Sequence, residues 1–324
     1  MIRSYIGNTR RYLSNMVNSG GAIVLYHRVI DLKNDPQMLA VSPDNFYNQV
    51  KYLKENFELL TIEDFYRFIQ SGNRLPDRAV IVTFDDGYAD NFYQALPILE
   101  SLNAQALFYV STSKLNSSSE MWWDALERIF LMTLPLPQQL KLIIKNKEHS
   151  FLTDSEKNKT EAYHQLHVLL KYCKIDERDE LMGSLHNWAS IEPGGRQNYF
   201  MMTSEEIKNM SLSPSAVIGA HTHNHPALSV LSYEEQLAEM LQSKTILENI
   251  IGKKVVHFSY PFGSRSDYNR DSIRAAKAAG FKMVSANYYG QVHSWTNRFA
   301  LPRILIRNWT ENEFKQNAKR FFKY

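Results

Sequence analysis

The chain has 324 residues, of which 44% are hydrophobic and 22% are charged. That composition supports a large buried core and excludes a disordered polymer. The 37 Lys and Arg against 34 Asp and Glu leave a net charge of +3, which is too small a surplus to indicate nucleic acid as a partner.

Features that report on the compartment are few. Cys173 is the single cysteine, so an internal disulfide and a zinc site built on cysteines are both excluded. The first twenty residues contain no unbroken apolar stretch and no small-residue cleavage site, which argues against a secretory signal. No run of about 18 apolar residues is present. From these features we expect a cytoplasmic protein.

Strands and helices alternate in the first third of the chain. Residues 1–20 predict a basic amphipathic helix, which packs on the domain or lies on a membrane surface. Helices are predicted to begin after Ser42 and Thr61 and again near Ala95. This alternation predicts a parallel α/β sheet or barrel. The predicted buried strands are 22–26, 79–84 and 106–110.

Residues 115–205 interrupt the alternation. They are polar, rich in Lys and Glu, and mostly helical in pattern, so we interpret them as a helical insertion or lid rather than an independent core. The surrounding domain covers 21–324 and contains no internal repeat. After the insertion the alternation resumes, with strands at 216–220, 255–259 and 283–286 and helices at 233–250 and 271–279.

Two adjacent carboxylates, Asp85 and Asp86, follow the predicted strand 79–84. In parallel α/β folds the carboxyl ends of strands are where catalytic groups gather. Carboxylates that leave a hydrophobic strand need a partner, so one of the pair could bind a metal while the other acts as a base. The alternative is a solvated Asp-Asp-Gly turn.

Three histidines, His221, His223 and His225, fall within five residues after the strand 216–220. Imidazoles are common ligands of zinc and related cations, and one Asp with two His would leave a coordination position open for water, as in catalytic sites. We leave His223 as an orienting or bystander residue. A third segment, Phe258–Gly263, is aromatic-rich and either lines a sugar or acyl pocket or is a plain strand-to-turn junction.

Together these segments resemble the polysaccharide deacetylases of the NodB-homology family (carbohydrate esterase family 4). The family motif T-F-D-D-G is matched at Thr83–Gly87, and H-[ST]-x-x-H-P is matched at His221–Pro226. In the third motif, R-x-P-[YF], Ser259 stands in place of the Arg, whereas Pro261 and Phe262 match. The resemblance runs from 22 to 303 around the insertion, and it implies a distorted (β/α) barrel of the NodB type, within the α/β class.

The resemblance also implies roles for individual residues. Asp86, His221 and His225 would bind one divalent metal ion, usually zinc, with cobalt, nickel or iron as alternatives. Asp85 would be the general base that deprotonates a metal-bound water, and the backbone N–H of Phe262 would stabilise the oxyanion. The remaining residues assigned to the oxyanion and substrate pocket are Tyr88, Tyr260, Pro261 and Arg303.

Two residues that the family normally supplies are missing. Ser259 replaces the Arg that orients the catalytic Asp, and Arg303 is the candidate substitute, the alternative being a structural surface Arg. The late L-x-x-H motif, whose His is the general acid, has no clear match near the C-terminus, and His293 is a weak candidate for it. We choose His27 instead, because the permuted motif order of poly-N-acetylglucosamine deacetylases places a His at the end of this first strand; a core or capping His is the alternative.

The expected function is a metal-dependent hydrolase that removes acetyl from an N-acetylated sugar, either in a surface glycan or in a nucleotide- or polyprenyl-linked precursor. The alternatives are an O-acetyl esterase and a non-catalytic glycan-binding protein on the same fold. Both chain ends are basic, so we also expect peripheral contact with anionic lipid at the inner membrane face through the helix 2–17 and the tail Phe314–Tyr324.

Overall fold

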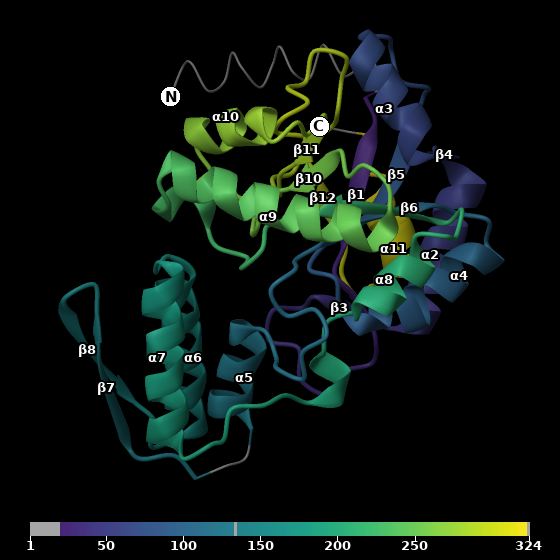
Figure 1. Cartoon of the computed structure of the whole chain (residues 1–324). Coiled ribbons are helices and arrows are strands. Elements are labelled where there is room, and N and C mark those ends of the chain that lie inside the picture. Colours follow the sequence, from purple (N-terminus) through teal and green to yellow (C-terminus); the bar gives the residue numbers. More distant parts are fainter. Residues whose placement is uncertain (1–19, 133–134, 323–324) are drawn as a thin grey trace, which may run out of the picture.

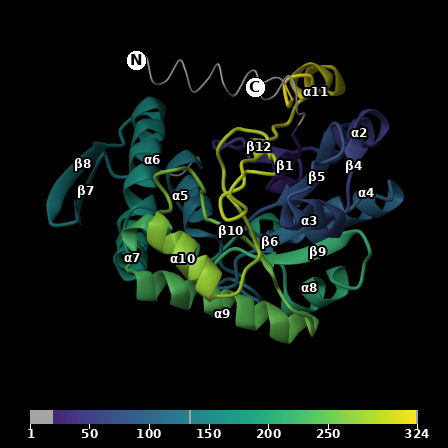
Figure 2. The ribbon, with the colours of Figure 1, turned by 90° about the horizontal axis from the view of Figure 1, so that it is seen from above.

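A curled parallel sheet organises the chain, of which the computed structural model describes residues 20–132 and 135–322. Its eight described strands are β1 (Ala22–Tyr26), β4 (Glu58–Leu59), β5 (Ala79–Phe84), β6 (Ala106–Val110), β9 (Ala216–Ala220), β10 (His257–Ser259), β11 (Met283–Ser285) and β12 (Ile304–Leu305). Their order is β11-β10-β9-β6-β5-β1-β12, with β4 also paired to β5. Every pairing is parallel, so the carboxyl ends lie at one edge. The curled sheet confirms the predicted distorted (β/α) barrel (Figure 2).

Helices cover the outside of this sheet (Figure 1). The two predicted N-caps are confirmed, because the hydroxyls of Ser42 and Thr61 accept hydrogen bonds from the backbone N–H three residues later. The covering helices are α2 (Pro43–Asn56), α3 (Ile62–Ser71), α4 (Leu96–Ser101), α8 (Ser204–Met210), α9 (Tyr233–Ile251), α10 (Arg270–Ala278) and α11 (Glu311–Ala318). Short helical turns add η1 (Asn91–Ala95), η2 (Gln197–Tyr199) and η3 (Leu228–Val230).

The sequence placed most of these elements within one or two residues. The strand predicted at 255–259 begins only at His257, and the helix predicted near Ala95 starts as the π-helical turn η1 before α4. Pro97 explains the second difference, because proline lacks an N–H and its ring crowds the carbonyl four residues earlier, which favours a wider turn.

The insertion differs from its predicted form in two respects. Besides α5 (Trp122–Leu131), α6 (Glu156–Lys171) and α7 (Ile175–Ala189), it contains the antiparallel hairpin β7 (Gln139–Ile144) and β8 (Lys147–Leu152). Lys145 and Asn146 form the turn, and both have positive φ, as a type I′ hairpin turn requires. The region also has its own hydrophobic cluster, contrary to our expectation, and that cluster extends to Tyr88 and Met201 of the barrel. A further short pair, β2 (Arg28–Val29) and β3 (Ala40–Val41), follows β1.

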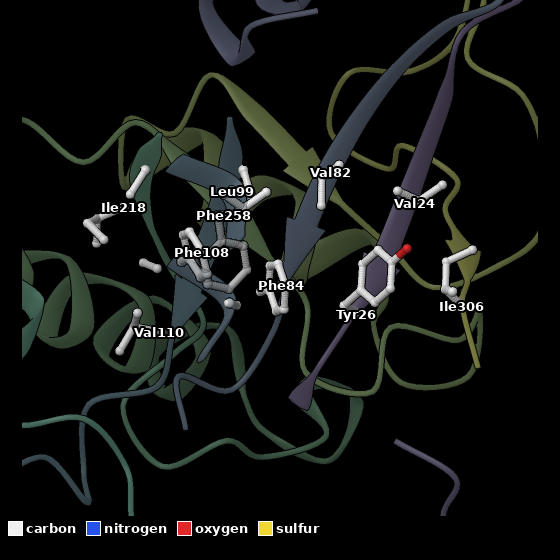
Figure 3. Packing of buried hydrophobic residues seen from close by; sticks show 14 of the residues in the cluster. Val24, Tyr26, Val82, Phe84, Leu99, Phe108, Val110, Ile218, Phe258 and Ile306 are labelled. Carbon is white, nitrogen blue, oxygen red and sulfur yellow. The ribbon is translucent and has the colours of Figure 1, made fainter. Parts of the chain in front are cut away.

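The main core lies between the sheet and its helices (Figure 3). Phe84 and Phe108 stack with ring centroids 4.8 Å apart, and Tyr26 stacks on the other side of Phe84 at 5.5 Å. The Tyr26 hydroxyl, which is fully buried, donates to Gln49 of α2. This aromatic row lies at the ends of β1 and β5. It therefore holds in place the backbone from which the residues after these two strands emerge.

Three described aromatic residues near the C-terminus pack against the barrel. Phe314 is 0% exposed and Phe321 is 2% exposed, and Phe322 stacks on Phe57 with ring centroids 5.7 Å apart. Phe314 and Phe321 therefore belong to the core of the barrel and are not available for membrane contact, while lipid contact by the rest of the tail stays a prediction. The helix predicted at 2–17 lies outside the described residues. Among the described residues, no helix combines the length and apolar character needed to cross a bilayer.

Replacing Phe108 by Ala is expected to lower the free energy of unfolding by about 3–5 kcal/mol, because it leaves a cavity beneath Phe84. Chemical denaturation measured by circular dichroism gives the value. Ile143→Ala is the control: its side chain is 70% exposed on β7, so a change within about 0.5 kcal/mol is expected. Equal destabilisation by both changes would contradict this account of the core.

Candidate active site

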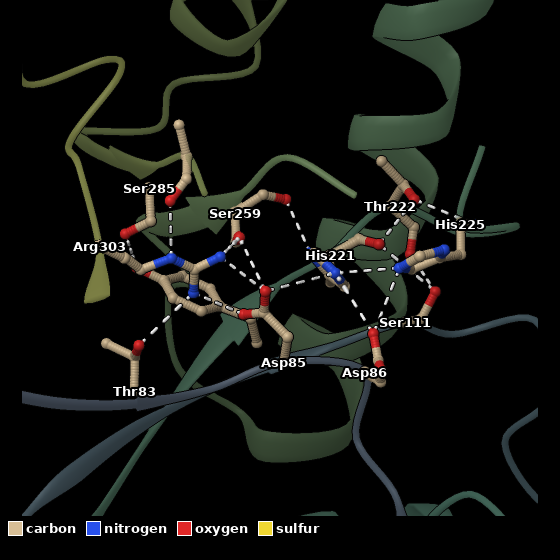
Figure 4. A network of polar contacts seen from close by, with 12 residues as sticks. Thr83, Asp85, Asp86, Ser111, His221, Thr222, His225, Ser259, Ser285 and Arg303 are labelled. Carbon is tan, nitrogen blue, oxygen red and sulfur yellow. Dashed lines mark hydrogen bonds and ion pairs between the residues drawn. The ribbon is translucent and has the colours of Figure 1, made fainter. Parts of the chain in front are cut away.

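Polar side chains gather at the edge of the sheet where the parallel strands end. His27 follows β1, Asp85 and Asp86 follow β5, His221 follows β9, and Ser259 is the last residue of β10. Figure 4 shows that the side chains of the aspartates, His221 and Ser259 lie close together. Residues up to 232 positions apart in the chain thus meet in one place, because parallel strands present their carboxyl ends together.

Asp86, His221 and His225 form a compact set of donor atoms. Asp86 Oδ1 lies 3.5 Å from His221 Nε2 and 3.2 Å from His225 Nε2, and the two Nε2 atoms are 3.2 Å apart. The Nδ1–H of His221 donates to the carbonyl of Ser259 at 2.8 Å, which leaves Nε2 with a lone pair for coordination. Two imidazoles and one carboxylate suit zinc and related divalent cations, so these residues fit a metal.

The charge balance favours a cation at the same point. Asp85 and Asp86 are both buried, and Arg303 is the guanidinium that opposes them. Burial alone would raise the pKa of Asp86, but its close contacts with the imidazoles of His221 and His225 outweigh burial and hold that pKa well below its usual value. Two buried carboxylates against one guanidinium leave a surplus of negative charge, which favours binding of a cation.

Arg303 holds the carboxylate of Asp85 in a bidentate ion pair, which we call the clamp. Its Nη1 and Nη2 donate to the two carboxylate oxygens at 2.7 and 2.6 Å, a bidentate pair with both side chains buried. Nη2 also donates to the hydroxyl of Ser259 at 2.7 Å, and Nε donates to the carbonyl of Ala286 at 2.8 Å. The structure thus brings Arg303 into the position where the Arg replaced by Ser259 would be needed, and the alternative of a surface Arg is wrong.

This clamp sets the protonation of Asp85. Burial alone would raise the pKa of the Asp85 carboxyl, but the charge and hydrogen bonds of Arg303, together with His221, outweigh it and lower the pKa below its ordinary value. Asp85 is therefore a carboxylate across the neutral range, the form that a proton acceptor requires. Its Oδ2 lies 3.8 Å from His221 Nε2, so the proposed base stands beside the metal ligands.

His27 lies at the same edge, at the end of β1. Burial lowers its pKa, whereas the charges of Asp86 and Asp85 raise it, so these groups lie within electrostatic reach of the imidazole. Its carbonyl accepts a hydrogen bond from Asn91, and its Nδ1 has no partner among the described residues. The Nδ1 of His27 is thus not engaged in a cap, and the role of His27 as general acid stays a prediction.

Two tight three-residue turns shape the walls of the site. The N–H of Gly87 donates to the carbonyl of Asp85, with Asp86 between them at φ 74°, and the N–H of Gly263 donates to the carbonyl of Pro261, with Phe262 between them at φ 60°. A non-glycine residue with positive φ costs about 1–2 kcal/mol, so both turns are strained. No acceptor for the N–H of Phe262 is found in the described part of the chain, so this group is available as an oxyanion donor.

The insertion contributes to the site, which the sequence did not reveal. The ring of His225 packs against Trp123 of α5 at 4.6 Å and against Phe262 at 4.7 Å. Trp123 Nε1–H donates to the Tyr88 hydroxyl at 2.8 Å, and that hydroxyl donates to Asp124 at 2.7 Å. Burial raises the pKa of Asp124 to about 8. The run Trp122-Trp123-Asp124 was visible in the sequence, but nothing there named its partners.

Other residues singled out from the sequence lie elsewhere. Tyr88 is 1% exposed and belongs to the contact with α5, and Tyr260 is fully buried in the core, stacked on Tyr268 and donating to the carbonyl of Phe299. Tyr88 lines a small pocket beside Arg28 and Asp124. Tyr260 was placed in the substrate pocket from its position in a motif, which does not report side-chain direction. Pro261 is buried in its turn, His223 contacts Thr112 instead of the metal ligands, and His293 lies beside Gly20 at the opposite end of β1.

Comparisons with known proteins agree with this arrangement. The family model described as "Polysaccharide deacetylase" matches residues 72–162 and 185–284, which is more than half of the chain. YxkH of Bacillus subtilis strain 168, a protein named as a polysaccharide deacetylase, is 21% identical over 286 residues, covering 88% of this chain and 70% of that protein. The poly-beta-1,6-N-acetyl-D-glucosamine N-deacetylase of Escherichia coli strain K12 is 28% identical over 92 residues, which are 28% of this chain and 14% of that enzyme.

The fold has a solved counterpart as well. The Streptococcus pyogenes deacetylase PplD, solved in complex with acetate, is similar with a TM-score of 0.61 over 93% of this chain and 99% of that chain, at 20% identity. At that identity the likeness shows a shared fold. The family-model match covers both the Asp-Asp segment and the His segment that the structure brings together, and the chain therefore belongs to the polysaccharide deacetylase family and is a hydrolase of that family.

Proposed function

We propose that this hydrolase is a metal-dependent N-deacetylase that releases acetate from an N-acetylated amino sugar of a glycan. The observation that carries the proposal is the convergence of three metal-ligand side chains with a carboxylate held ionised by Arg303. The partial match to the Escherichia coli N-deacetylase supports an N-acetylated substrate. An O-acetyl ester is the alternative outcome of the same assay.

The residues divide the reaction between them. Asp86, His221 and His225 would hold a divalent ion, zinc being the first choice, whose chemistry is to polarise a carbonyl and make water a better nucleophile. The Asp85 carboxylate takes a proton from the attacking water while the water oxygen forms a bond to the carbonyl carbon of the acetyl group. The N–H of Phe262 donates to the oxygen that becomes negative. His27 gives a proton to the leaving nitrogen as the C–N bond breaks, so acetate and a free amine result.

Asp85→Asn is expected to reduce acetate release by roughly 10²–10⁴-fold, because the amide cannot accept the proton. Acetate is measured from N-acetylated oligosaccharides with metal-reconstituted protein, and bound metal is measured by elemental analysis. Metal content should stay at that of the unaltered chain, because Asp85 is not among the three ligands. Unchanged turnover would remove Asp85 from the mechanism.

Histidine variants make the matched comparison for metal binding. His225→Ala should lose the metal, whereas His223→Ala, a change in the same motif, should retain both metal and activity, since its ring contacts Thr112. Loss of the metal in both variants would contradict the assigned ligand set.

His27→Ala is expected to slow hydrolysis of the N-acetyl amide by roughly 10²–10⁴-fold while leaving hydrolysis of an aryl acetate ester nearly unchanged. The reason is the leaving group: an amine must be protonated as it departs, whereas a phenolate departs without help. Both rates are measured on the same preparation. A parallel fall of both rates would instead indicate a structural role for the imidazole.

Removing the clamp should shift the pH dependence in a defined direction. With Arg303→Met, the largest influence that opposes the burial of Asp85 is lost and His221 alone opposes it less, so the pKa of Asp85 rises and the acidic limb of the kcat/KM profile moves to higher pH. Arg303→Lys retains the charge without the bidentate contact, so its limb should lie between the two. If the acidic limb of the Arg303→Met profile does not move, Arg303 does not control the protonation of Asp85. Thermal melts check folding, since breaking a buried pair costs about 3–5 kcal/mol.

A further inference from the structure

The turn that carries the Phe262 N–H depends on its surroundings for its shape. Phe262 has φ 60°, in the left-handed region that a phenylalanine adopts only at an energetic cost. A backbone in this region persists only where neighbouring structure holds it there. An oxyanion donor, in turn, acts only when it is already placed where the negative charge develops. The contacts of the loop 261–267 therefore decide whether the Phe262 N–H can serve as that donor.

Asp267 is the buried centre of this loop, with 0% of its surface exposed. Its Oδ2 accepts a hydrogen bond from the N–H of Ser264 at 2.9 Å, and its own N–H donates to the Ser264 carbonyl, also at 2.9 Å. Its carbonyl accepts from the N–H of Ser229 in η3 at 3.0 Å. These bonds close the backbone directly after Gly263 into a fixed turn and attach it to the barrel.

The insertion reaches the loop through the end of α6. Lys171, the last residue of that helix, places its Nζ 2.7 Å from Asp267 Oδ1, and the Tyr172 hydroxyl donates to the same oxygen at 2.9 Å. The Lys171 Nζ also lies 4.5 Å from the centroid of the Phe262 ring, a cation–π contact. Lys171 thus contacts both the residue that bears the donor N–H and the carboxylate that closes the loop.

Two neighbours confine the Phe262 ring. Lys171 contacts it through Nζ, and the ring of His225, one of the candidate metal ligands, packs against it with centroids 4.7 Å apart. Removing the Lys171 charge would leave the Asp267 carboxylate buried without its cation, which is strongly destabilising. The loop must then open toward water to solvate that carboxylate, and the Phe262 backbone would relax from its left-handed conformation.

We propose that Lys171 and Tyr172 of the insertion are positioning residues, which act through Asp267 to hold the Phe262 N–H where it can donate to the oxyanion. The inference rests on the proposed N-deacetylase function and deepens it, because it gives α6 a part in stabilising the transition state. A donor to the oxyanion acts more strongly on the transition state than on the neutral acetyl group. Loss of these contacts should therefore lower kcat and leave KM nearly unchanged.

Turnover and the binding of a tetrahedral analogue test this role. In the metal-loaded chain, Lys171→Met is expected to lower kcat by roughly 10–100-fold and to change KM by less than about twofold. Binding of a methylphosphonamidate analogue of an N-acetylglucosamine oligosaccharide, measured by calorimetry, should weaken by the same factor as kcat, because its tetrahedral phosphorus mimics the transition state. Tyr172→Phe, which removes one hydrogen bond and keeps the lysine, should give smaller losses of the same kind.

Three results would overturn the positioning role. The first is unchanged kcat and analogue affinity in both variants. The second is an equal loss of affinity for the analogue and for the substrate, whose binding is measured in the Asp85→Asn chain. The third is a fall in kcat that accompanies loss of bound metal, because the effect would then act through His225.

Lys174→Met is the matched control. Lys174 also joins the insertion to the barrel, with its Nζ 3.0 Å from Glu235, but that partner belongs to α9 instead of the loop 261–267. Both side chains of this pair are largely exposed, so kcat and analogue affinity should stay within about twofold of the unaltered chain. A loss equal to that of Lys171→Met would show that any contact between insertion and barrel suffices, and would contradict the specific role of Lys171.

The amide of Phe262 can be followed without turnover. In the chain labelled with ¹⁵N-phenylalanine, its NMR signal is assigned by its absence in Phe262→Leu. Lys171→Met should shift or broaden that signal, and Lys174→Met should leave it unchanged. If the signal responds in this way but the unaltered chain releases no acetate from N-acetylated oligosaccharides, the N-deacetylase proposal fails and the hold on the loop stands. If acetate is released and neither kcat nor the signal responds to Lys171→Met, the positioning role fails and the proposed function stands.

Discussion

Two adjacent carboxylates buried at the end of one strand are the constraint on which this site depends. Neither can remain charged in a low-dielectric environment without its own partner, and the structure gives each a different one. Asp85 receives the guanidinium of Arg303 and Asp86 receives two imidazoles. The strained turn at Asp86 sends the neighbouring side chains in different directions, so one faces Arg303 and the other faces the two imidazoles. The different partners of Asp85 and Asp86 thus follow from the backbone geometry of these two residues.

The guanidinium that pairs with Asp85 belongs to Arg303 and comes from a different strand end than Ser259. Ser259 is too short to reach Asp85 with a charge, yet its hydroxyl accepts from Arg303 and its carbonyl accepts from His221. A small residue at the end of β10 leaves the room that the Arg303 side chain fills from the start of β12. A barrel interior brings side chains of different strands to one point, so Arg303, which directly precedes β12, reaches Asp85 beside Ser259 of β10.

Local signals in the sequence sufficed for much of this. Apolar runs predicted β1, β5, β6 and β9, and capping residues predicted α2 and α3, because those signals act over a few residues. The hairpin of the insertion also had a local signal, the alternation along 139–144, which the surrounding Lys and Glu masked. Arg303 was named from the sequence as the candidate partner of Asp85, and the structure brings the two together. By contrast, the burial of Tyr260 depends on side-chain direction across the barrel, which no spacing along the chain encodes.

The insertion is part of the catalytic architecture because of what holds His225. Its Nδ1 has no hydrogen-bond partner among the described residues, unlike that of His221, so packing between Trp123 and Phe262 orients the ring together with the Nε2 contact to Asp86. Trp123 is in turn tied through the Tyr88 hydroxyl to Asp124, and Tyr88 directly follows the Asp-Asp-Gly turn. A continuous set of contacts therefore runs from His225 through Trp123 of the insertion to Tyr88, which is next to the turn that bears Asp86. Displacing α5 would release His225 and strain the turn at Asp86 together, so the insertion and the barrel cannot be treated as separate units at this site.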